Sequence, residues 1–490
     1  MAREFESRVA ETLFFRFVLV SLGKNTRCLR EGIRELATET FASIPTAGTP
    51  AATETQPWPR LAAAWYAMAV YVLTLMFLFL DQGVIAQLVT PIKKDFGLSD
   101  TDVGWLLGPA TVIFFAIVGL PLARLADSKS RKLMLATGIA VWSLATAACG
   151  LAQGFWQLFI CRFFVGAGGS VNGPATYSMI ADFFPPRLLP AALTVLQIGF
   201  FVGVAAAPII GSSMITLATQ LAASPLPVVG QVHPWQIVFV FVGLPGVIVA
   251  LLMMTVQEPP RRLRPSDAVA GTIPISEVIR FLRSKWNVYG PMFYGLAPGV
   301  LFLGAVQGWY ATFFERTYHW TTAEWGLRFG PVTAIATVVG LPAGLLLNTY
   351  FARRGRDDTN ILVLVIGQGL AAPFAIFGPL MPDPWLALVC FGVVGLGGTI
   401  GSASQNAAFQ LITPAPIRAQ ATALYLFVFT LGLGIGPLVL GWITDHIFGD
   451  EAALRWAMAS MGVVLMPLAV YFYASGRKPY AAEIARLRES

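Results

Sequence analysis

The sequence predicts an all-α membrane protein with twelve transmembrane helices in two pseudo-symmetric halves of six. Three observations lead to this fold class. First, 56% of the 490 residues are hydrophobic and 12% are charged, and the mean hydropathy is +0.68, whereas charged residues make up roughly 25% of a soluble domain. Second, the chain contains twelve apolar segments long enough to cross a bilayer. Third, short patterns of the first half return in the same order in the second.

Each predicted span holds roughly 20 mostly apolar residues, which at about 1.5 Å rise per residue cover about 30 Å of hydrocarbon. The spans fall near residues 62–89, 101–124, 131–152, 155–181, 190–218, 234–256, 287–314, 324–349, 360–380, 384–411, 418–444 and 453–474. The predicted organisation is an amino-terminal extension (1–59), a first half (60–256), a cytoplasmic linker (257–286), a second half (287–475) and a cytoplasmic tail (476–490).

Basic residues predict the orientation, because Lys and Arg in short loops stay on the cytoplasmic side of a membrane. With both termini in the cytoplasm, the basic loops on the inner side are 127–132, 185–189, 258–285, 352–358 and 414–418. The opposite loops carry little charge or, as at 315–328 and 445–455, charges of both signs. We therefore expect a multi-pass protein of a bacterial inner membrane. The net charge of +7 then reflects topology and attraction to anionic lipid, not nucleic-acid binding.

The first 59 residues do not fit the pattern of spans. Their longest apolar run, TLFFRFVLVSLG (12–23), is short and contains Arg16. It therefore predicts neither a span nor a signal peptide. Two interpretations stay open: an amphipathic surface helix followed by a Thr-, Ala- and Pro-rich linker at 38–57, or an over-extended translation start.

Residue types that support catalysis or metal binding are few and dispersed. The cysteines, at positions 28, 149, 161 and 390, have no metal or redox spacing and are expected to act as small hydrophobic residues. The histidines lie far apart, at positions 233, 319 and 446. The phosphate-binding pattern GxxxxGK[ST] is absent from the sequence, which argues against ATP-driven pumping. We expect no enzyme activity, no metal and no cofactor.

An internal repeat relates the two halves. GLPLARLADSKSRKLML (119–135) has a counterpart in GLPAGLLLNTYFARRGR (340–356). RLLPAAL (187–193) is echoed by RAQATAL (418–424), and GVAAAPIIG (203–211) by GLGIGPLVLG (432–441). Each pair falls on corresponding spans, which predicts two rigid halves that rock about a central site.

Several of these segments resemble known motifs of the major facilitator superfamily. Residues 119–135 resemble its loop motif GxLaDRxGRRxxL, retaining Leu125, Ala126, Asp127, Arg131, Lys132 and Leu135 and departing at Ala123, Ser128 and Ser130. CRFFVGAGG, around Arg162, resembles the fourth-span motif. GVAAAPIIG resembles the fifth-span antiporter-type motif, with Ala207 at its second glycine.

The resemblance covers residues 60–475 and is greatest to the spinster-related branch. It rests on LDQGVIAQLVTPIKKDFGLSDTDVGWL, VWSLATAACGLA and IADFFPP. It implies two six-helix halves and secondary transport. Spinster-like relatives handle lysolipids and sphingoid lipids, while other branches carry aromatic acids, sugars or drugs, so the resemblance does not fix the cargo.

The loop motif predicts a conformational latch. Asp127 lies at a span end, where it can accept hydrogen bonds from a neighbouring helix N-terminus and pair with Arg131. The gating-motif residues are Asp127, Arg131 and Lys132 in the first half and Arg353 and Arg354 in the second. Asn348 or Thr349 stands where the second copy would carry its acid, which predicts a weaker latch there. The alternative is an ordinary charge at the membrane interface.

Small residues and prolines of the repeat predict close helix packing. They are Gly199, Gly203, Pro208, Gly211, Gly436 and Pro437.

Asp81 lies inside the apolar run MFLFLDQGVIAQ. Because an unpaired buried carboxylate binds a proton readily, the sequence predicts a proton-coupling role for Asp81 together with Arg162, the cationic residue within the first-half spans. Asn172 and Gln197 are alternative polar partners, and a structural role is the alternative function. The resemblance implies an arginine after the acid and a fourth-span glutamate, and here Gln82 and Gly169 occupy those positions.

Polar and aromatic residues inside the spans are candidates for a substrate cavity, with helix-to-helix packing as the alternative for each. They are Asn172, Tyr177, Gln197, Gln307, Trp309, Tyr310, Gln405, Asn406 and Gln410. Few fixed charges and many amides favour a small organic or amphipathic, even lipid-like, solute. Glu315 and Arg316 end the seventh span and are expected at an outer gate.

The sequence therefore predicts a monomeric secondary transporter that works by alternating access and is coupled to protons. Two alternatives stay open: an uncoupled facilitator on the same fold, and a non-transporting sensor or membrane enzyme.

Overall fold

Helices build the part of the chain that the structure describes, which comprises residues 58–115, 117–118, 130–185, 187–222, 233–261, 274–414 and 416–489. The computed structural model contains no strand within these ranges. The extension predicted at 1–59 falls outside them except for its last two residues, and Asp127 falls outside them as well.

The first half runs from α3 to α11. Its helices are α3 (Leu61–Ile85), α4 (Val89–Phe96), α5 (Asp100–Leu107), α7 (Arg131–Cys149), α8 (Phe155–Gly169), α9 (Asn172–Phe183), α10 (Leu189–Ala222) and α11 (Pro234–Thr255). Two predicted spans differ from single long helices: the second, 101–124, is described only to residue 118, and the fourth, 155–181, is divided between α8 and α9 at Ser170 and Val171.

The second half follows a short linker helix, α13 (Ile275–Ser284). Its helices are α14 (Trp286–Tyr318), α15 (Thr322–Arg353), α16 (Thr359–Phe377), η1 (Gly378–Leu380), α17 (Pro384–Ile412), α18 (Arg418–Ile443), η2 (Thr444–Phe448), η3 (Glu451–Ala453) and α19 (Leu454–Glu489). Within the described ranges, 10 helices are long and apolar enough to cross a membrane. Together with the partly described second span and the divided fourth span, they account for the twelve predicted spans.

Local sequence explains where two important helices begin. At α5, the Ser99 Oγ accepts a hydrogen bond from the Asp102 N–H at 3.1 Å, and the Asp102 carboxylate accepts one from the Ser99 N–H at 3.0 Å. Thr321 and Glu324 form the same reciprocal pair at the start of α15. Each capping box satisfies N–H groups of a first turn that has no helical acceptor, so it fixes the start of a helix that contacts the opposite half.

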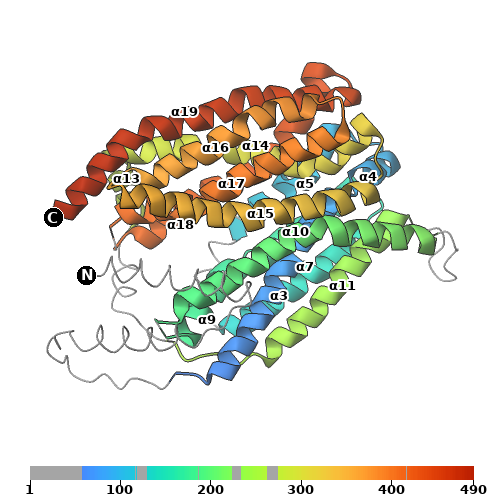
Figure 1. The fold of residues 1–490 in the computed structure, drawn as a ribbon. Coiled ribbons are helices and arrows are strands. Elements are labelled where there is room, and N and C mark those ends of the chain that lie inside the picture. The colour runs from blue at the N-terminus through green and yellow to red at the C-terminus, as the bar shows by residue number, and fades with distance from the viewer. Residues whose placement is uncertain are drawn as a thin grey trace, which may run out of the picture. The chain divides into compact units, whose positions relative to one another are not determined.

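The ends of the described bundle are distinct. The short helix α4 lies at one end, which we call the α4 end (Figure 1). The linker helix α13 and the last turns of α19 lie at the other, which we call the α13 end (Figure 1).

Each half has its own helix packing. In the first half, α3 packs on α10, and α7 packs on α8 and α11; in the second, α14 packs on α18 and α19, and α16 on α17 and α19. The halves meet where α5 contacts α18 and where α10 contacts α15. One cluster of buried apolar residues combines Val89 and Val103 of the first half with Trp309, Phe314 and other residues of the second, so the two halves share a core at the α4 end.

Candidate functional site

Glycine lets the two halves touch backbone to backbone. A Cβ on Gly108 would lie 1.7 Å from the Gly434 carbonyl oxygen, which joins α5 to α18. A Cβ on Gly326 would lie 1.7 Å from the Ser212 Oγ and 2.2 Å from the Pro208 carbonyl oxygen, which joins α15 to α10. Since real Cβ atoms do not approach so closely, any larger residue at these glycines must move the helices apart.

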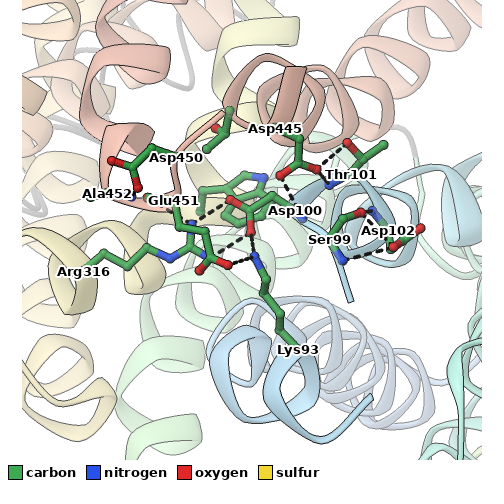
Figure 2. Close-up of polar contacts among 12 residues, drawn as sticks. Lys93, Ser99, Asp100, Thr101, Asp102, Arg316, Asp445, Asp450, Glu451 and Ala452 are labelled. Carbon is green, nitrogen blue, oxygen red and sulfur yellow. Dashed lines mark hydrogen bonds and ion pairs between the residues drawn. The ribbon is translucent and has the colours of Figure 1, made fainter. Parts of the chain in front are cut away.

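A buried carboxylate lies at the centre of the charged contacts between the halves (Figure 2). Asp100, at the start of α5, is 0% exposed. It accepts hydrogen bonds from the Arg316 Nη1 at 2.7 Å and Nη2 at 2.8 Å. It also contacts the Lys93 ammonium, whose Nζ lies 2.8 Å from an oxygen of Glu451. We call Lys93, Asp100, Arg316 and Glu451 the gate network; the first two belong to the first half and the others to the second.

The electrostatics keep Asp100 ionised. Burial raises the pKa of this carboxyl group, but the hydrogen bonds and charges of Arg316 and Lys93 lower it by more, so that its pKa lies below the ordinary value. A two-pronged arginine contact of this kind is stronger and more directional than a single hydrogen bond between neutral groups. The gate network therefore depends on charge as well as shape.

Two further contacts join the halves at the α4 end. The Asp445 carboxylate of η2 accepts hydrogen bonds from the Thr101 N–H and Oγ1, both at 2.6 Å, and from the Asp100 N–H at 3.3 Å. These N–H groups belong to the first turn of α5, where an acid is favourable. The Thr90 hydroxyl donates to Glu315 at 2.6 Å. Glu315 and Arg316, expected at an outer gate, thus both contact the first half.

Asp81 and Arg162 lie together inside the first half. Asp81 is 3% exposed and Arg162 is 1% exposed. The Arg162 Nη1 lies 3.6 Å from one Asp81 oxygen, and the Thr146 hydroxyl donates to the other at 2.8 Å. The group therefore joins α3, α7 and α8. Of the partners considered from the sequence, Arg162 is the one that the structure brings to Asp81, and Thr146 was not anticipated.

The gating-motif arginine of the first half has partners at the α13 end. Arg131, 3% exposed, donates from Nη1 to Asp182 at 2.5 Å and to Ser178 at 2.9 Å. Glu258 accepts a hydrogen bond from the Arg131 N–H at 2.9 Å and contacts the Ser130 hydroxyl. Asp127, the predicted partner, lies outside the described residues. Within those residues, Asp182 links the start of α7 to α9, and Glu258 links it to the segment after α11. Lys132, the next motif residue, lies in the first turn of α7.

The second half carries a related latch with exchanged charges. Asp358, just before α16, accepts two hydrogen bonds from Arg356 at 2.9 Å and one from the Arg477 Nε of α19 at 2.8 Å. In the first half the cation, Arg131, lies at the start of the third span and the acid, Glu258, follows the sixth span. In the second half the acid, Asp358, lies at the start of the third span and the cation, Arg477, lies near the end of the sixth. Asn348 and Thr349 stand where the second copy of the motif would carry its acid, and Asp358, the acid that pairs with Arg356 and Arg477, lies farther along the chain.

The other motif residues of this loop have different contacts. The Asn348 amide donates to the Ser404 hydroxyl at 2.6 Å. The Arg354 guanidinium lies 4.2 Å from the ring centre of Tyr350. Arg353 is the last residue of α15.

We expect Glu258→Gln to weaken the first-half latch and its pH dependence. Burial raises the pKa of Glu258, but hydrogen bonds from Ser130 and the Arg131 N–H lower it by more, so the net pKa is lowered. A carboxylate of this kind stabilises the fold above its unfolded-state pKa, and the contribution is lost as pH falls through the lower folded-state value. At neutral pH the variant should lose about 1–3 °C in Tm, because a hydrogen bond to a charged group contributes about 1.5–3 kcal/mol and a chain of this length shifts by about 1 °C per kcal/mol.

Thermal unfolding between pH 3 and pH 7 measures this effect. The wild-type Tm should fall more steeply below about pH 4.5 than that of the variant. Glu277→Gln, at an exposed position of α13, is the control. Parallel wild-type and Glu258→Gln curves would contradict a charge-dependent latch.

The predicted packing residues lie at close helix contacts. A Cβ on Gly199 would lie 3.2 Å from the Val72 Cα, and one on Gly203 would lie 2.9 Å from the Met76 Cα. A Cβ on Gly211 would lie 2.4 Å from the Gln87 side chain, and one on Gly436 would lie 2.3 Å from the Leu301 carbonyl oxygen. Pro208 and Pro437 lie within α10 and α18.

The cavity candidates divide into buried and exposed groups. Trp309 donates to the Pro437 carbonyl oxygen at 3.0 Å, and Tyr310 packs against Phe329 and Phe391 with ring centres 4.8 and 4.7 Å away. Both residues make contacts of core packing, which was the alternative to a place in the substrate cavity. Asn172 is also buried and accepts a hydrogen bond from Thr176 at 3.1 Å.

The remaining candidates are more accessible. Tyr177 donates to Gln197 at 3.4 Å. Gln405 is half-buried, and the exposed residues are Tyr177, Gln197, Gln307, Asn406 and Gln410. Two pockets, of about 320 and 560 Å³, lie at the α13 end of the second half, and none of the nine candidates lines them.

Comparison with known proteins agrees with the architecture. The sequence profile of the Major Facilitator Superfamily matches residues 71–357 and 359–489. An "MFS-type efflux pump" of Mycolicibacterium smegmatis is 27% identical over 426 residues, covering 84% of this chain and 93% of the relative. "Protein spinster homolog 1" of Xenopus laevis is 25% identical over 409 residues, covering 79% of this chain and 74% of the relative.

Solved structures show the same fold. A bacterial homologue of the human lysosomal transporter spinster, in an inward-facing and unoccupied conformation, superposes with a TM-score of 0.73 at 24% identity, covering 87% of this chain and 98% of the other. A D-xylose–proton symporter superposes with a TM-score of 0.59 at 16% identity, covering 83% and 97%. The predicted fold of twelve helices in two halves and the resemblance to spinster relatives are confirmed. The chain therefore belongs to the Major Facilitator Superfamily, whose members are multi-pass membrane transporters.

Proposed function

We propose that the protein is a secondary transporter that moves a small organic or amphipathic solute by alternating access, with Asp81 coupling the movement to protons. The observation that carries this proposal is the distribution of contacts. The hydrogen bonds and ion pairs described between the halves lie at the α4 end, whereas the two latches at the α13 end each join helices of one half. This arrangement suits a state closed at the α4 end, in which each half moves as a rigid body.

The difference between the two ends of the bundle also suggests its orientation in the membrane. The described basic residues of the α13 end include Arg131, Arg356 and Arg477, so this end faces the cytoplasm of a bacterial inner membrane under the positive-inside rule. In that orientation the gate network closes the path to the outside.

Substrate class is inferred from what the spans offer. Amides and a tyrosine are accessible on α9, α10, α14 and α17, and such groups suit a weakly charged solute. A "cis,cis-muconate transport protein" of Acinetobacter baylyi is among the relatives, at 25% identity over 373 residues, which is consistent with a small organic acid. A thermal-shift screen of organic acids and lysolipids on the purified protein distinguishes these two classes.

An uncoupled facilitator is the second candidate. Asp81 is paired with Arg162, is only 3% exposed, and has Gln82 beside it. A carboxylate held by a cation and sealed from water does not exchange protons with either side in that state.

We expect Asp81→Asn to abolish solute accumulation driven by a pH gradient, a loss of about tenfold or more, while exchange down a solute gradient persists. The amide keeps the size of the side chain and the Thr146 contact but cannot exchange a proton. The measurement is uptake of a ligand found by the screen into proteoliposomes with an imposed pH gradient. Thr146→Val, which leaves both charges in place, should keep the pH response. A wild-type protein that ignores the gradient would establish the facilitator.

A further inference from the structure

The last helix is longer than a membrane is thick. The 36 residues of α19 span about 54 Å at about 1.5 Å per residue, against about 30 Å of hydrocarbon. Tyr480 is 1% exposed and Glu483 contacts Lys285, so the protruding turns are fixed to the second half. The residues near Arg477 and Lys478 therefore lie at the depth of lipid headgroups.

A pocket of about 560 Å³ opens at this depth. Its walls include the small residues Ala474, Ser475 and Ala481 of α19, which leave room for a ligand. Its charged lining consists of Arg356, Arg477, Lys478 and Asp358.

The charges of this pocket do not cancel. Arg356 and Arg477 share a single carboxylate, Asp358. Lys478 is exposed and forms no ion pair within the described part of the chain. Three cations against one carboxylate leave two positive charges, so the pocket still has net positive charge after it binds one monoanionic phosphodiester.

An apolar stripe leads directly into the pocket. Val464, Leu468 and Tyr471 are 57%, 40% and 65% exposed. With Ser475 and Lys478 they follow one another at intervals of three or four residues, which places all five on one face of α19. A ligand in the pocket thus has an apolar surface beside it on the membrane side.

We propose that this pocket binds the phosphate of an anionic phospholipid in the leaflet where α19 ends, with an acyl chain along the Val464–Leu468–Tyr471 stripe. Arginine forks and a lysine ammonium are the protein groups that bind phosphate oxygens best. The stripe distinguishes a lipid from free phosphate, because only the lipid gains from the apolar contact. The proposal depends on the membrane location of the chain and not on which solute it transports.

Lipid binding is connected to the second-half latch. The phosphate competes with Asp358 for Arg356 and Arg477, so removing the Asp358 charge should strengthen lipid binding. A purely structural pocket would not respond in this direction.

The test measures lipid retention by native mass spectrometry and the Tm gained on adding lipid to the purified full-length protein in detergent. Phosphatidylglycerol should bind and stabilise, whereas phosphatidylcholine and inorganic phosphate should do so much less. Lys478→Gln should weaken phosphatidylglycerol binding about fivefold, the effect of about one basic residue at an anionic surface. Lys94→Gln, an exposed lysine of the α4 end, is the matched control.

Two more variants test whether the Asp358 charge weakens or strengthens lipid binding. Asp358→Asn should increase phosphatidylglycerol retention, and Glu489→Gln, which changes the net charge equally, should not. The proposal is overturned if Lys478→Gln and Lys94→Gln bind the lipid alike, or if Asp358→Asn and Glu489→Gln have equal effects. Equal stabilisation by inorganic phosphate and phosphatidylglycerol would assign the pocket to a soluble anion instead.

Discussion

Asp100→Asn is expected to open the α4 end of the protein. The substitution removes the charge of the buried carboxylate that the Lys93 ammonium and the Arg316 guanidinium both contact. The carboxylate that these two cations then still share is that of Glu451, which is largely exposed. Removing one partner of a buried ion pair costs about 3–5 kcal/mol. Because the contact joins the two halves, this cost falls on the closed state, and the ratio of closed to open protein should drop by about a hundredfold or more.

Distance measurements between spin labels test this directly. Labels at Lys94→Cys on α4 and Asp450→Cys beside η3, in protein whose four native cysteines are replaced, report the separation of the halves. The wild type should give one short distance and Asp100→Asn a longer one. An unchanged distance in Asp100→Asn would mean that the gate network does not hold this end closed.

The control and the pH response sharpen the test. Asp102→Asn changes an acid of the same helix that caps α5 without touching the other half, so it should leave the distance unchanged. Mild acidification to pH 5 should not reproduce the effect of Asp100→Asn, because the lowered pKa keeps Asp100 charged.

Gly108→Ala is the second change with a large expected effect. Its new Cβ would lie 1.7 Å from the Gly434 carbonyl oxygen, so α5 and α18 must separate. Overpacking of a tight contact costs about 1–3 kcal/mol, which lowers the closed population about fivefold to a hundredfold. Transport should slow accordingly, since a cycle needs both ends to close in turn.

The matched control is Gly369→Ala in α16, where an added Cβ meets nothing within 4 Å. It should leave transport and the spin-label distance unchanged. The helical content of both variants should equal that of the wild type by circular dichroism, because neither change affects packing within a half. Normal transport by Gly108→Ala would show that the α5–α18 contact is dispensable.

The gate network shows what sequence reasoning could and could not reach. The sequence predicts a gate position for Arg316 because this residue ends a span, which is a local property. The sequence gives no such signal for Asp100, since an acid after a capping serine is common at a helix start. Only its partners Arg316 and Asp445, more than 200 and 300 positions away, distinguish it from an ordinary first-turn acid such as Asp102.

The buried pair of the first half was more accessible to sequence analysis. A carboxylate and a guanidinium in neighbouring apolar spans need partners, which made Asp81 and Arg162 candidates for each other. Thr146 gave no such signal, because a threonine can satisfy its hydroxyl within its own helix. Trp309 and Tyr310 could not be sorted into cavity or core, since both environments favour large aromatic side chains.

The sequence by itself determined the twelve spans, their division into two halves, the family and the expected orientation. These properties depend on composition, on local periodicity and on which loops hold the basic residues. Each segment of the chain shows them without any contact to another segment. The tertiary structure decided at which end the described hydrogen bonds and ion pairs join the halves, which of the described acids meet Arg131 and Arg316, and that Asp358 pairs with Arg356 and Arg477. Those are contacts between segments far apart in the chain, so no local pattern predicts them. Between the halves, glycines such as Gly108 and Gly326 permit the close approach of the helices.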